Sequence, residues 1–306
     1  MIIKSNNETI YNKILGAIMK MSSNPDDAIF SYTLMGIPIV INIDDKINNF
    51  NNQNHEDSLI YTDGRGIKIV GNLIEINSIL TTYGTVNVLK HELEHILLQH
   101  IARLKDFGKY FNEYSKNDIT EIFNIASDYI INKDLGITGN GFVNDEYMRR
   151  FGFTPTDLEK KSAEEIAVMI IKNTPPMKLS EKLKELKKIL SGDGFGGKSA
   201  FNHMVNYEIS DFKDFIEKNS KNFGGNFDKY LSDIIKSAIT TYGYGQSSVW
   251  KKLDQIYGKS LVDWNAVLTD ELRQYKSKET AENGVKVVNR RYYQLSTYIK
   301  TPILFN

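Results

Sequence analysis

The chain has 306 residues, of which 41% are hydrophobic and 25% charged, and its 38 basic and 38 acidic residues give a formal net charge of zero. This balance provides no long-range attraction to nucleic acid or to an anionic membrane. The absence of cysteine excludes disulfides, thiolate catalysis and Cys-ligated metal sites, so any metal must be held by His, Asp or Glu.

The early part of the chain alternates between helix and strand patterns. Residues 8–21 space their apolar side chains three and four apart, which indicates an amphipathic helix. The Ile- and Val-rich segment 34–43 predicts a strand, and Pro38 favours an edge position for it. Residues 44–57 form a polar, Asn-rich loop, and 67–76 predicts a second strand or a hairpin.

Helical patterns dominate the rest of the chain. The segment 86–107 predicts one long helix closed by Gly108, and 119–133 predicts a second, with Asp118 as N-cap and Glu121 as its capping-box partner. An α+β fold follows, mostly helical with a small early β-sheet. Further helices are expected at 163–172, 180–190, 207–238 and 247–275, with a closing strand or extended arm at 284–298.

No stretch approaches the ~20 apolar residues that a helix needs to cross a bilayer. The N-terminus lacks the basic region and long apolar run of a signal peptide. We therefore expect a cytoplasmic protein that binds neither a membrane nor nucleic acid.

Three of the five histidines fall within ten residues, between His91 and His100. His91 and His95 are four residues apart, so on a helix they lie on one face and can share one Zn²⁺ at about 2.0–2.1 Å. Glu92 stands where it can act as general base on a water held by the metal. A chance match on a structural helix is the alternative, and the scarcity of histidine argues against it. The pattern predicts a catalytic zinc site on this helix.

Two neighbouring residues need separate interpretation. Glu94 occupies a position that is usually uncharged in such motifs, so it either faces solvent or supports a ligand. On a continuous helix His100 would project nearly opposite His91, at about 100° per residue. We therefore expect His100 to be packed in the core or to contact a ligand, and not to bind the metal.

A catalytic zinc site needs a third protein ligand. The predicted helix 119–133 carries a polar stripe of Glu121, Asn124, Asp128 and Asn132. A stripe of this kind is often a solvated helix face, but the rest of the helix is apolar enough to be central. We favour Asp128 as the ligand because it lies mid-helix, whereas capping explains Glu121.

These motifs resemble the zincin-type metallopeptidase domain that usually precedes a von Willebrand factor A-like domain. The resemblance rests on His-Glu-x-x-His-x-x-x-x-His-x-x-Arg, here His91 to Arg103, and on Ala-x-Asp-Tyr-x-x-Asn, here Ala126 to Asn132. It implies a zincin fold with Asp128 as third ligand. Because no Asp-x-Ser-x-Ser motif occurs, an A-like or AAA+ partner would be a separate protein. Looser matches lie at Asp263-Trp264 and Arg290-Arg291.

The sequence therefore predicts a zinc-dependent metallopeptidase acting on a peptide or protein substrate, with Zn²⁺ as its cofactor. A non-peptidase metal hydrolase, such as an amidase or deacylase, is one alternative. A zincin-fold binding or scaffold protein without catalysis is the other.

The glycine-rich segment 191–198 is the one clear flexible stretch. We divide the chain into a zincin-like catalytic domain at 1–190, a flexible loop at 191–198, and a mostly helical part at 199–306 that packs on the catalytic domain.

Two further roles are left open. His203, just after the glycine-rich segment, is a candidate to stabilise the oxyanion, although a surface or packed histidine fits as well; Tyr129, Tyr292 and Tyr293 are alternatives. The segment 68–76 is a candidate edge strand for pairing with a substrate backbone.

Overall fold

The computed structural model describes residues 2–44, 59–111, 114–138, 142–174, 181–183 and 226–242. The chain divides into two compact units, Met1–Tyr257 and Gly258–Asn306, and every described residue lies in the first. The segments predicted at 191–198, 247–275 and 284–298 lie outside the described residues, and the proposed domain boundaries stay a prediction. Within the described ranges, no helix is both long and apolar enough to cross a membrane.

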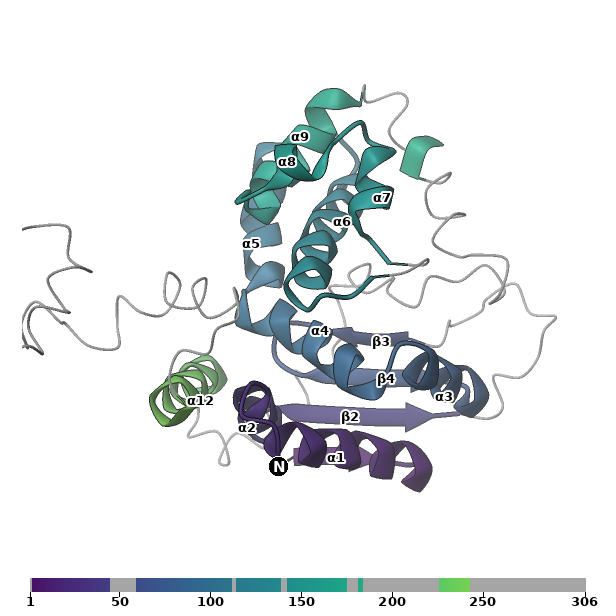
Figure 1. The fold of residues 1–306 in the computed structure, drawn as a ribbon, viewed down its shortest axis with the longest axis vertical. Helices are drawn as coiled ribbons and strands as arrows, with labels where there is room; N and C mark the ends of the chain where they lie inside the picture. The colour runs from purple at the N-terminus through teal and green to yellow at the C-terminus, as the bar shows by residue number, and fades with distance from the viewer. Residues whose placement is uncertain are drawn as a thin grey trace, which may run out of the picture. The chain divides into compact units, whose positions relative to one another are not determined.

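A small mixed sheet is formed by the early strands, in the order β1-β2-β4-β3 (Figure 1). β1, β2 and β4 are parallel, and β3 runs antiparallel to β4. Alternate isoleucines pair across one face of the sheet, Ile39 with Ile67 and Ile41 with Ile69, and all four are buried. This face forms part of the core. The strands are β1 (Ile2–Ser5), β2 (Pro38–Ile43), β3 (Leu59–Thr62) and β4 (Ile67–Gly71).

Helices make up most of the described residues, so the predicted α+β class is confirmed. Helix α4 lies between the sheet and α6 in Figure 1, and it contacts β3, α1 and α6. The helices are α1 (Glu8–Ser22), α2 (Ala28–Gly36), α3 (Leu73–Thr82), α4 (Thr85–Leu97), α5 (His100–Phe107), η2 (Gly108–Tyr110), α6 (Lys116–Asp134), α7 (Asp145–Arg149), α8 (Pro155–Leu158), α9 (Ala163–Asn173) and α12 (Phe227–Tyr242).

A second apolar core joins α5, α6, α7, α8 and α9. Phe123 of α6 is fully buried in it, and its ring lies 5.3 Å from that of Phe107 in α5. Met148 of α7 and Ile166 of α9 are also fully buried there. Because α6 contributes to this core and also contacts α4, it connects the helical half of the unit to the sheet half.

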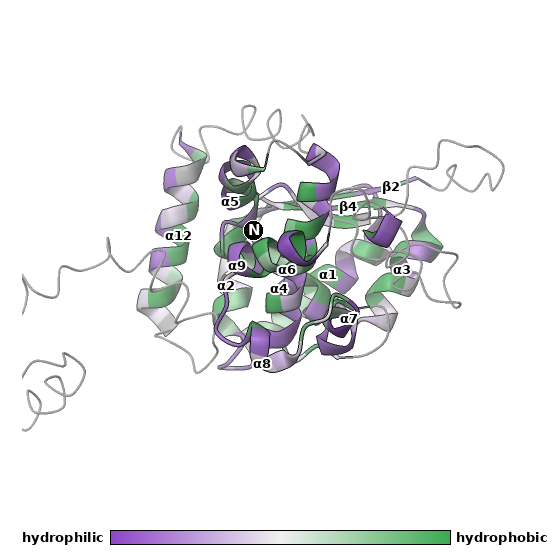
Figure 2. Cartoon of the chain, turned by 90° about the horizontal axis from the view of Figure 1, so that it is seen from above, coloured by the Kyte–Doolittle hydropathy of each residue, from purple (hydrophilic) through white to green (hydrophobic). Residues whose placement is uncertain are grey.

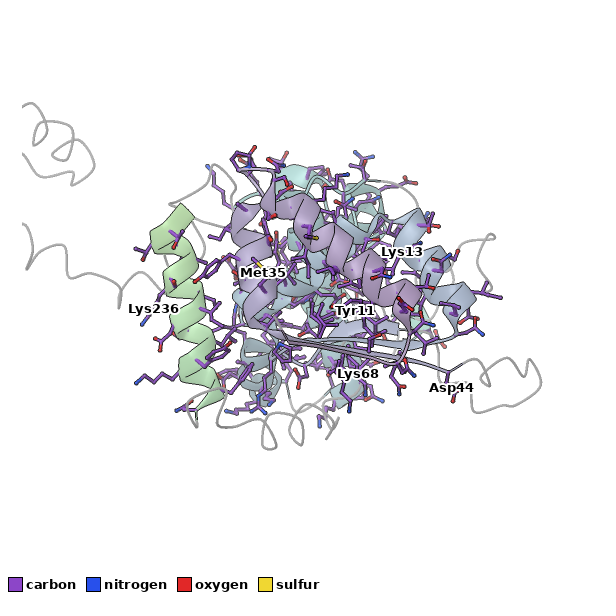
Figure 3. All side chains as sticks on the ribbon, turned by 90° about the horizontal axis from the view of Figure 1, so that it is seen from below. Tyr11, Lys13, Met35, Asp44, Lys68 and Lys236 are labelled. Atoms are coloured by element: carbon purple, nitrogen blue, oxygen red, sulfur yellow. The ribbon has the colours of Figure 1, made fainter. Side chains whose placement is uncertain are left out.

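Helix α12 packs against α2, far from it in sequence. Figure 2 shows hydrophobic and hydrophilic residues alternating along α12, as expected for a helix with one buried face. The Tyr230 hydroxyl donates to the Gly36 carbonyl at 3.0 Å, and Tyr32 and Ser237 share a hydrogen bond of 3.0 Å. Figure 3 shows the two helices side by side, marked by Met35 on α2 and Lys236 on α12.

The structure corrects the predicted strand at 34–43. Helix α2 continues to Gly36, and β2 begins only at Pro38. β2 is an inner strand, because it pairs with both β1 and β4. Proline is tolerated there because it is the first residue of the strand.

The prediction of an edge strand at 68–76 was also wrong. β4 ends at Gly71 and is paired on both sides, with β2 and β3. Asn72 then caps α3, since its Oδ1 accepts from the Ile74 amide at 2.7 Å. This segment therefore offers no open strand edge to a substrate.

Candidate metal centre

The second half of helix α4 is buried on all sides, which places its polar residues inside the protein. Val88, Leu89 and the whole run 91–97 are buried. The sheet half covers one side of the helix, and α6 lies on another. His91 and His95 are consequently both fully buried.

Helix α6 supplies the other polar residues of the site. It begins one turn earlier than predicted, because Ser115 is its N-cap and accepts from the Asp118 amide at 3.1 Å. The predicted cap at Asp118 was therefore wrong, and Glu121 is a half-buried residue of the helix body with no capping role. The helix ends where predicted, with Gly136 in the left-handed region at φ 65°.

The structure brings His91, His95 and Asp128 together. The two Nε2 atoms are 3.2 Å apart, and Asp128 Oδ1 lies 3.1 Å from His95 Nε2 and 3.6 Å from His91 Nε2. Ligands at about 2.0–2.2 Å in a tetrahedral zinc site are roughly 3.3–3.6 Å from one another. The three donor atoms therefore have the spacing of three corners of such a site, and they form a cluster that could hold a metal ion.

Asparagines on α6 hold two of these side chains. Asn132 Nδ2 donates to the Val143 carbonyl at 3.1 Å, which turns its Oδ1 toward His91 Nδ1 at 3.0 Å. Asn124 Nδ2 donates to Asp128 Oδ2 at 3.4 Å, on the oxygen that does not face the histidines. The polar stripe of α6 thus faces the candidate metal centre over much of its length.

The electrostatics favour the protonation states that a metal requires. Burial raises the pKa of Asp128, but hydrogen bonds and charge from His91 and His95 outweigh it and hold the pKa below its usual value. Burial lowers the pKa of His95, against the opposing effect of Asp128. An ionised carboxylate and a neutral imidazole are the forms that bind metal.

Two glutamates of α4 are fully buried beside the ligands. Burial raises the pKa of Glu92 well above its ordinary value, and the negative charge of Asp128 raises it further. Glu94 is also fully buried, so the alternative that it faces solvent was wrong. Buried carboxyl groups on one helix turn are costly, which marks this turn as a functional one.

The single helix predicted at 86–107 is two helices. Gln99 adopts a left-handed conformation at φ 54°, and the chain turns there between α4 and α5. The turn carries His100 back toward the site, where its Nδ1 lies 3.2 Å from His95 Nδ1. His100 is buried and contacts a ligand on the side away from the cluster.

Arg103 supports this turn. Its Nη1 donates to the Leu98 carbonyl at 3.1 Å, next to the break, and its Nε donates to Glu164 Oε1 at 2.6 Å. A second contact joins Nη2 to the other Glu164 oxygen. The guanidinium thus ties the end of α4 to the start of α9 through a two-point contact with the carboxylate.

Of the residues proposed to stabilise the oxyanion, Tyr129 is the one that the structure describes. His203, Tyr292 and Tyr293 lie outside the described residues. The Tyr129 hydroxyl donates to Asp145 Oδ1 at 2.7 Å and accepts from Lys133, so it links α6 to α7.

Sequence reasoning missed one tyrosine near the site. Tyr147 of α7 is buried, and its pKa is raised by burial and then by the negative charges of Glu121 and Asp128. No local pattern distinguished this residue, because its position depends on how α7 packs against α6.

The part of the chain that holds the site is similar to one known domain family. Residues 60–170 match a family described as "Putative metallopeptidase domain". The match covers both sequence motifs and confirms the resemblance that they indicated, and it does not test the A-like neighbour. No curated protein and no solved structure shows significant similarity to the chain.

Proposed function

Because residues 60–170 match a metallopeptidase domain family, we propose that this chain is a zinc-dependent metallopeptidase of zincin type. In this proposal His91, His95 and Asp128 hold the zinc and Glu92 is the general base. The peptide substrate follows from the family, and the metal and the base from the site.

The observation that carries the proposal is the convergence of three donor atoms. Asn132 Oδ1 accepts a hydrogen bond from the Nδ1–H of His91, so in the neutral ring the lone pair of His91 Nε2 faces His95 and the ionised Asp128. With a proton between them these atoms attract one another, as in the hydrogen bonds of the two histidines to Asp128; once the protons are lost, atoms at 3.1–3.6 Å repel one another unless a metal ion lies among them. Two imidazoles and a carboxylate suit zinc, and three protein ligands leave the open position of a catalytic site.

Glu92 would carry the proton in the reaction. Zinc bound at this site would supply Lewis-acid polarisation of water and of the scissile carbonyl. One carboxylate oxygen of Glu92 accepts a proton from the attacking water and later returns it to the leaving nitrogen. The raised pKa of Glu92 suits this task, since it brings the carboxyl closer to the pH at which it must both take and return a proton.

The depth of the site favours one rival function. His91, Glu92 and His95 are fully buried, and Asp128 is 2% exposed. Such burial is typical of a metal that only stabilises the fold, as in a binding or scaffold protein. A structural zinc usually has four protein ligands, however, whereas the cluster within the described residues has three.

The test compares two isosteric changes on the same helix turn. Glu92→Gln should keep about one zinc per chain and lower kcat for peptide hydrolysis by roughly 10²–10⁴-fold, because the general base is lost. Glu94→Gln removes the other buried carboxylate of this turn and should lower kcat far less, because Glu94 is not the proposed base. Metal content by elemental analysis and hydrolysis of a peptide library provide the two readouts.

The outcomes separate the alternatives. Full hydrolysis by Glu92→Gln would rule out this residue as the base, and stoichiometric zinc in His91→Ala would rule out the ligand set. Zinc without hydrolysis of any peptide or small amide would support the scaffold function. Activity on small amides alone would identify an amidase or deacylase.

A further inference from the structure

Each of the two candidate ligand imidazoles has a partner at its Nδ1, on the side away from the three donor atoms of the candidate metal centre. For His91 the partner atom is the amide oxygen of Asn132, at 3.0 Å. For His95 it is the Nδ1 of His100, at 3.2 Å. A histidine can present an Nε2 lone pair to a metal in its neutral form only if the proton is on Nδ1. The group that accepts a hydrogen bond from Nδ1–H therefore determines whether the Nε2 lone pair is available to the metal.

Asn132 can act only as an acceptor toward His91. Its Nδ2 donates to the Val143 carbonyl, which has no proton to offer, so the amide cannot turn over without losing that bond. All three residues of this hydrogen-bonded series are buried: His91 fully, while Asn132 is 2% and Val143 4% exposed. The geometry thus fixes His91 as the Nδ1–H form.

His100 reaches His95 because the helix breaks between them. On an unbroken helix His100 would project away from the ligands, and the left-handed turn at Gln99 instead brings its ring to 5.1 Å from that of His95, in an edge-on arrangement. Phe123 also packs edge-on against His100, with ring centroids 6.3 Å apart. The His100 ring is thereby held with its Nδ1 toward His95.

We propose that Asn132 and His100 are a matched pair of positioning residues that hold His91 and His95 as Nδ1–H tautomers, so that both Nε2 lone pairs point at the metal. This inference rests on the proposed function, since it assigns roles around the same zinc. Neither acceptor is a carboxylate, so they orient the rings without adding negative charge to the centre. The contribution of each is the energy of one buried hydrogen bond and a restricted ring rotation.

The experiment compares paired variants that keep or remove the acceptor atom. In His100→Asn the amide oxygen can occupy the place of Nδ1, whereas His100→Leu has a similar shape and no acceptor. Asn132→Asp keeps the oxygen that faces His91, whereas Asn132→Leu removes it. Zinc affinity is measured by competition with a chromogenic chelator, and the visible absorption of the Co²⁺ form reports ligand geometry.

We expect each leucine variant to bind zinc 10–100-fold more weakly than the wild type and to show an altered Co²⁺ spectrum. His100→Asn should recover most of the affinity, and Asn132→Asp only part of it, because the carboxylate keeps the acceptor but loses the N–H that binds the Val143 carbonyl. Thermal unfolding of the metal-free proteins is the control, because a residue with a purely structural role would lower the apo melting temperature equally in both members of a pair.

The inference is overturned if His100→Leu and Asn132→Leu fold, bind zinc as tightly as the wild type and give its Co²⁺ spectrum. It is also overturned if affinity follows apo stability and not the presence of an acceptor. A wild type that binds no zinc would instead refute the proposed function. The two failures are therefore distinguishable.

Discussion

Helices α1 and α4 pack against each other but bury different kinds of residue. The buried residues of α1 are all apolar, Ile10, Ile14, Ala17, Ile18 and Met21, and follow one helical stripe. The buried residues of α4 cover every side of its second half and include two histidines and two glutamates. One helix is amphipathic, and the other takes its charged groups into the interior.

The difference separates a helix whose buried residues stabilise the fold from one whose buried polar residues suit the proposed metal site. Burying an aliphatic side chain such as Ile14 stabilises a fold by about 1.5–3 kcal/mol. Burying a carboxylate costs several kcal/mol unless a partner or a metal compensates for it. The buried glutamates of α4 therefore lower the stability of the fold, and a cation bound at the proposed site would offset this cost.

Of the changes that would test this comparison between α1 and α4, zinc binding should have the largest effect on the free energy of unfolding. At a free zinc concentration of about 1,000 times Kd, the free energy of unfolding should rise by about 4 kcal/mol, because only the folded chain assembles the three ligands. Denaturant unfolding with and without a chelator measures the change. The His95→Ala variant should show almost no rise, and an equal rise in it would mean that zinc binds elsewhere.

On the α1 side, Ile14→Ala should destabilise the fold by about 3 kcal/mol, because it leaves a cavity at a fully buried position. Zinc affinity of the folded protein should not change, since Ile14 contributes no polar group to the site. Urea unfolding and a zinc titration of the same sample provide both numbers. A large loss of zinc affinity would show that the two helices do not have separate roles.

A smaller effect is expected at the start of α1. Asn7 Oδ1 accepts from the Ile10 amide at 3.0 Å, and α4 has no such side-chain cap, because it begins after Gly84. Asn7→Ala should therefore cost about 1 kcal/mol in the free energy of unfolding. Asn7→Ser, which restores a capping oxygen, is the control and should recover most of the loss.

The smallest effect is expected at the break after α4. A left-handed conformation costs a residue such as Gln99 about 1–2 kcal/mol, and glycine avoids this cost but has more freedom in the unfolded chain. Gln99→Gly should therefore stabilise the protein by about 0.5 kcal/mol and leave zinc affinity unchanged, as judged by thermal unfolding and titration. A loss of zinc affinity would show that the glutamine side chain itself supports His100.

Much of the candidate site was readable from the sequence because it depends on spacing within single helices. The four-residue separation of His91 and His95 places both on one face of any α-helix. Helical spacing likewise placed Asp128 on the polar stripe of α6, and its mid-helix position favoured it as the ligand. The preference for Asp128 over Glu121 used a capping argument that the structure does not support, since Ser115 is the cap.

Local patterns failed where a long-range contact decided the outcome. The run 86–107 reads as one helix, and nothing in it marks Gln99 as a turn, because the left-handed residue is a glutamine and not a glycine. The turn is held in part by Arg103, which reaches Leu98 and the distant Glu164. Likewise β4 appeared to be an edge strand only because its pairing with β2 cannot be read from its own residues.

The sequence by itself determined the mostly helical α+β class, and it singled out the candidates of the site: His91, Glu92 and His95 by their spacing on one helix, and Asp128 by its place on the polar stripe of the next. Only the tertiary structure decided that Asp128 Oδ1 lies within 3.1–3.6 Å of both imidazoles and that Asn132 and His100 contact their other nitrogens. The physical reason is that a metal centre requires an accuracy of tenths of an ångström between side chains on different helices. That accuracy comes from the packing of α4 against α6 and from the turn at Gln99.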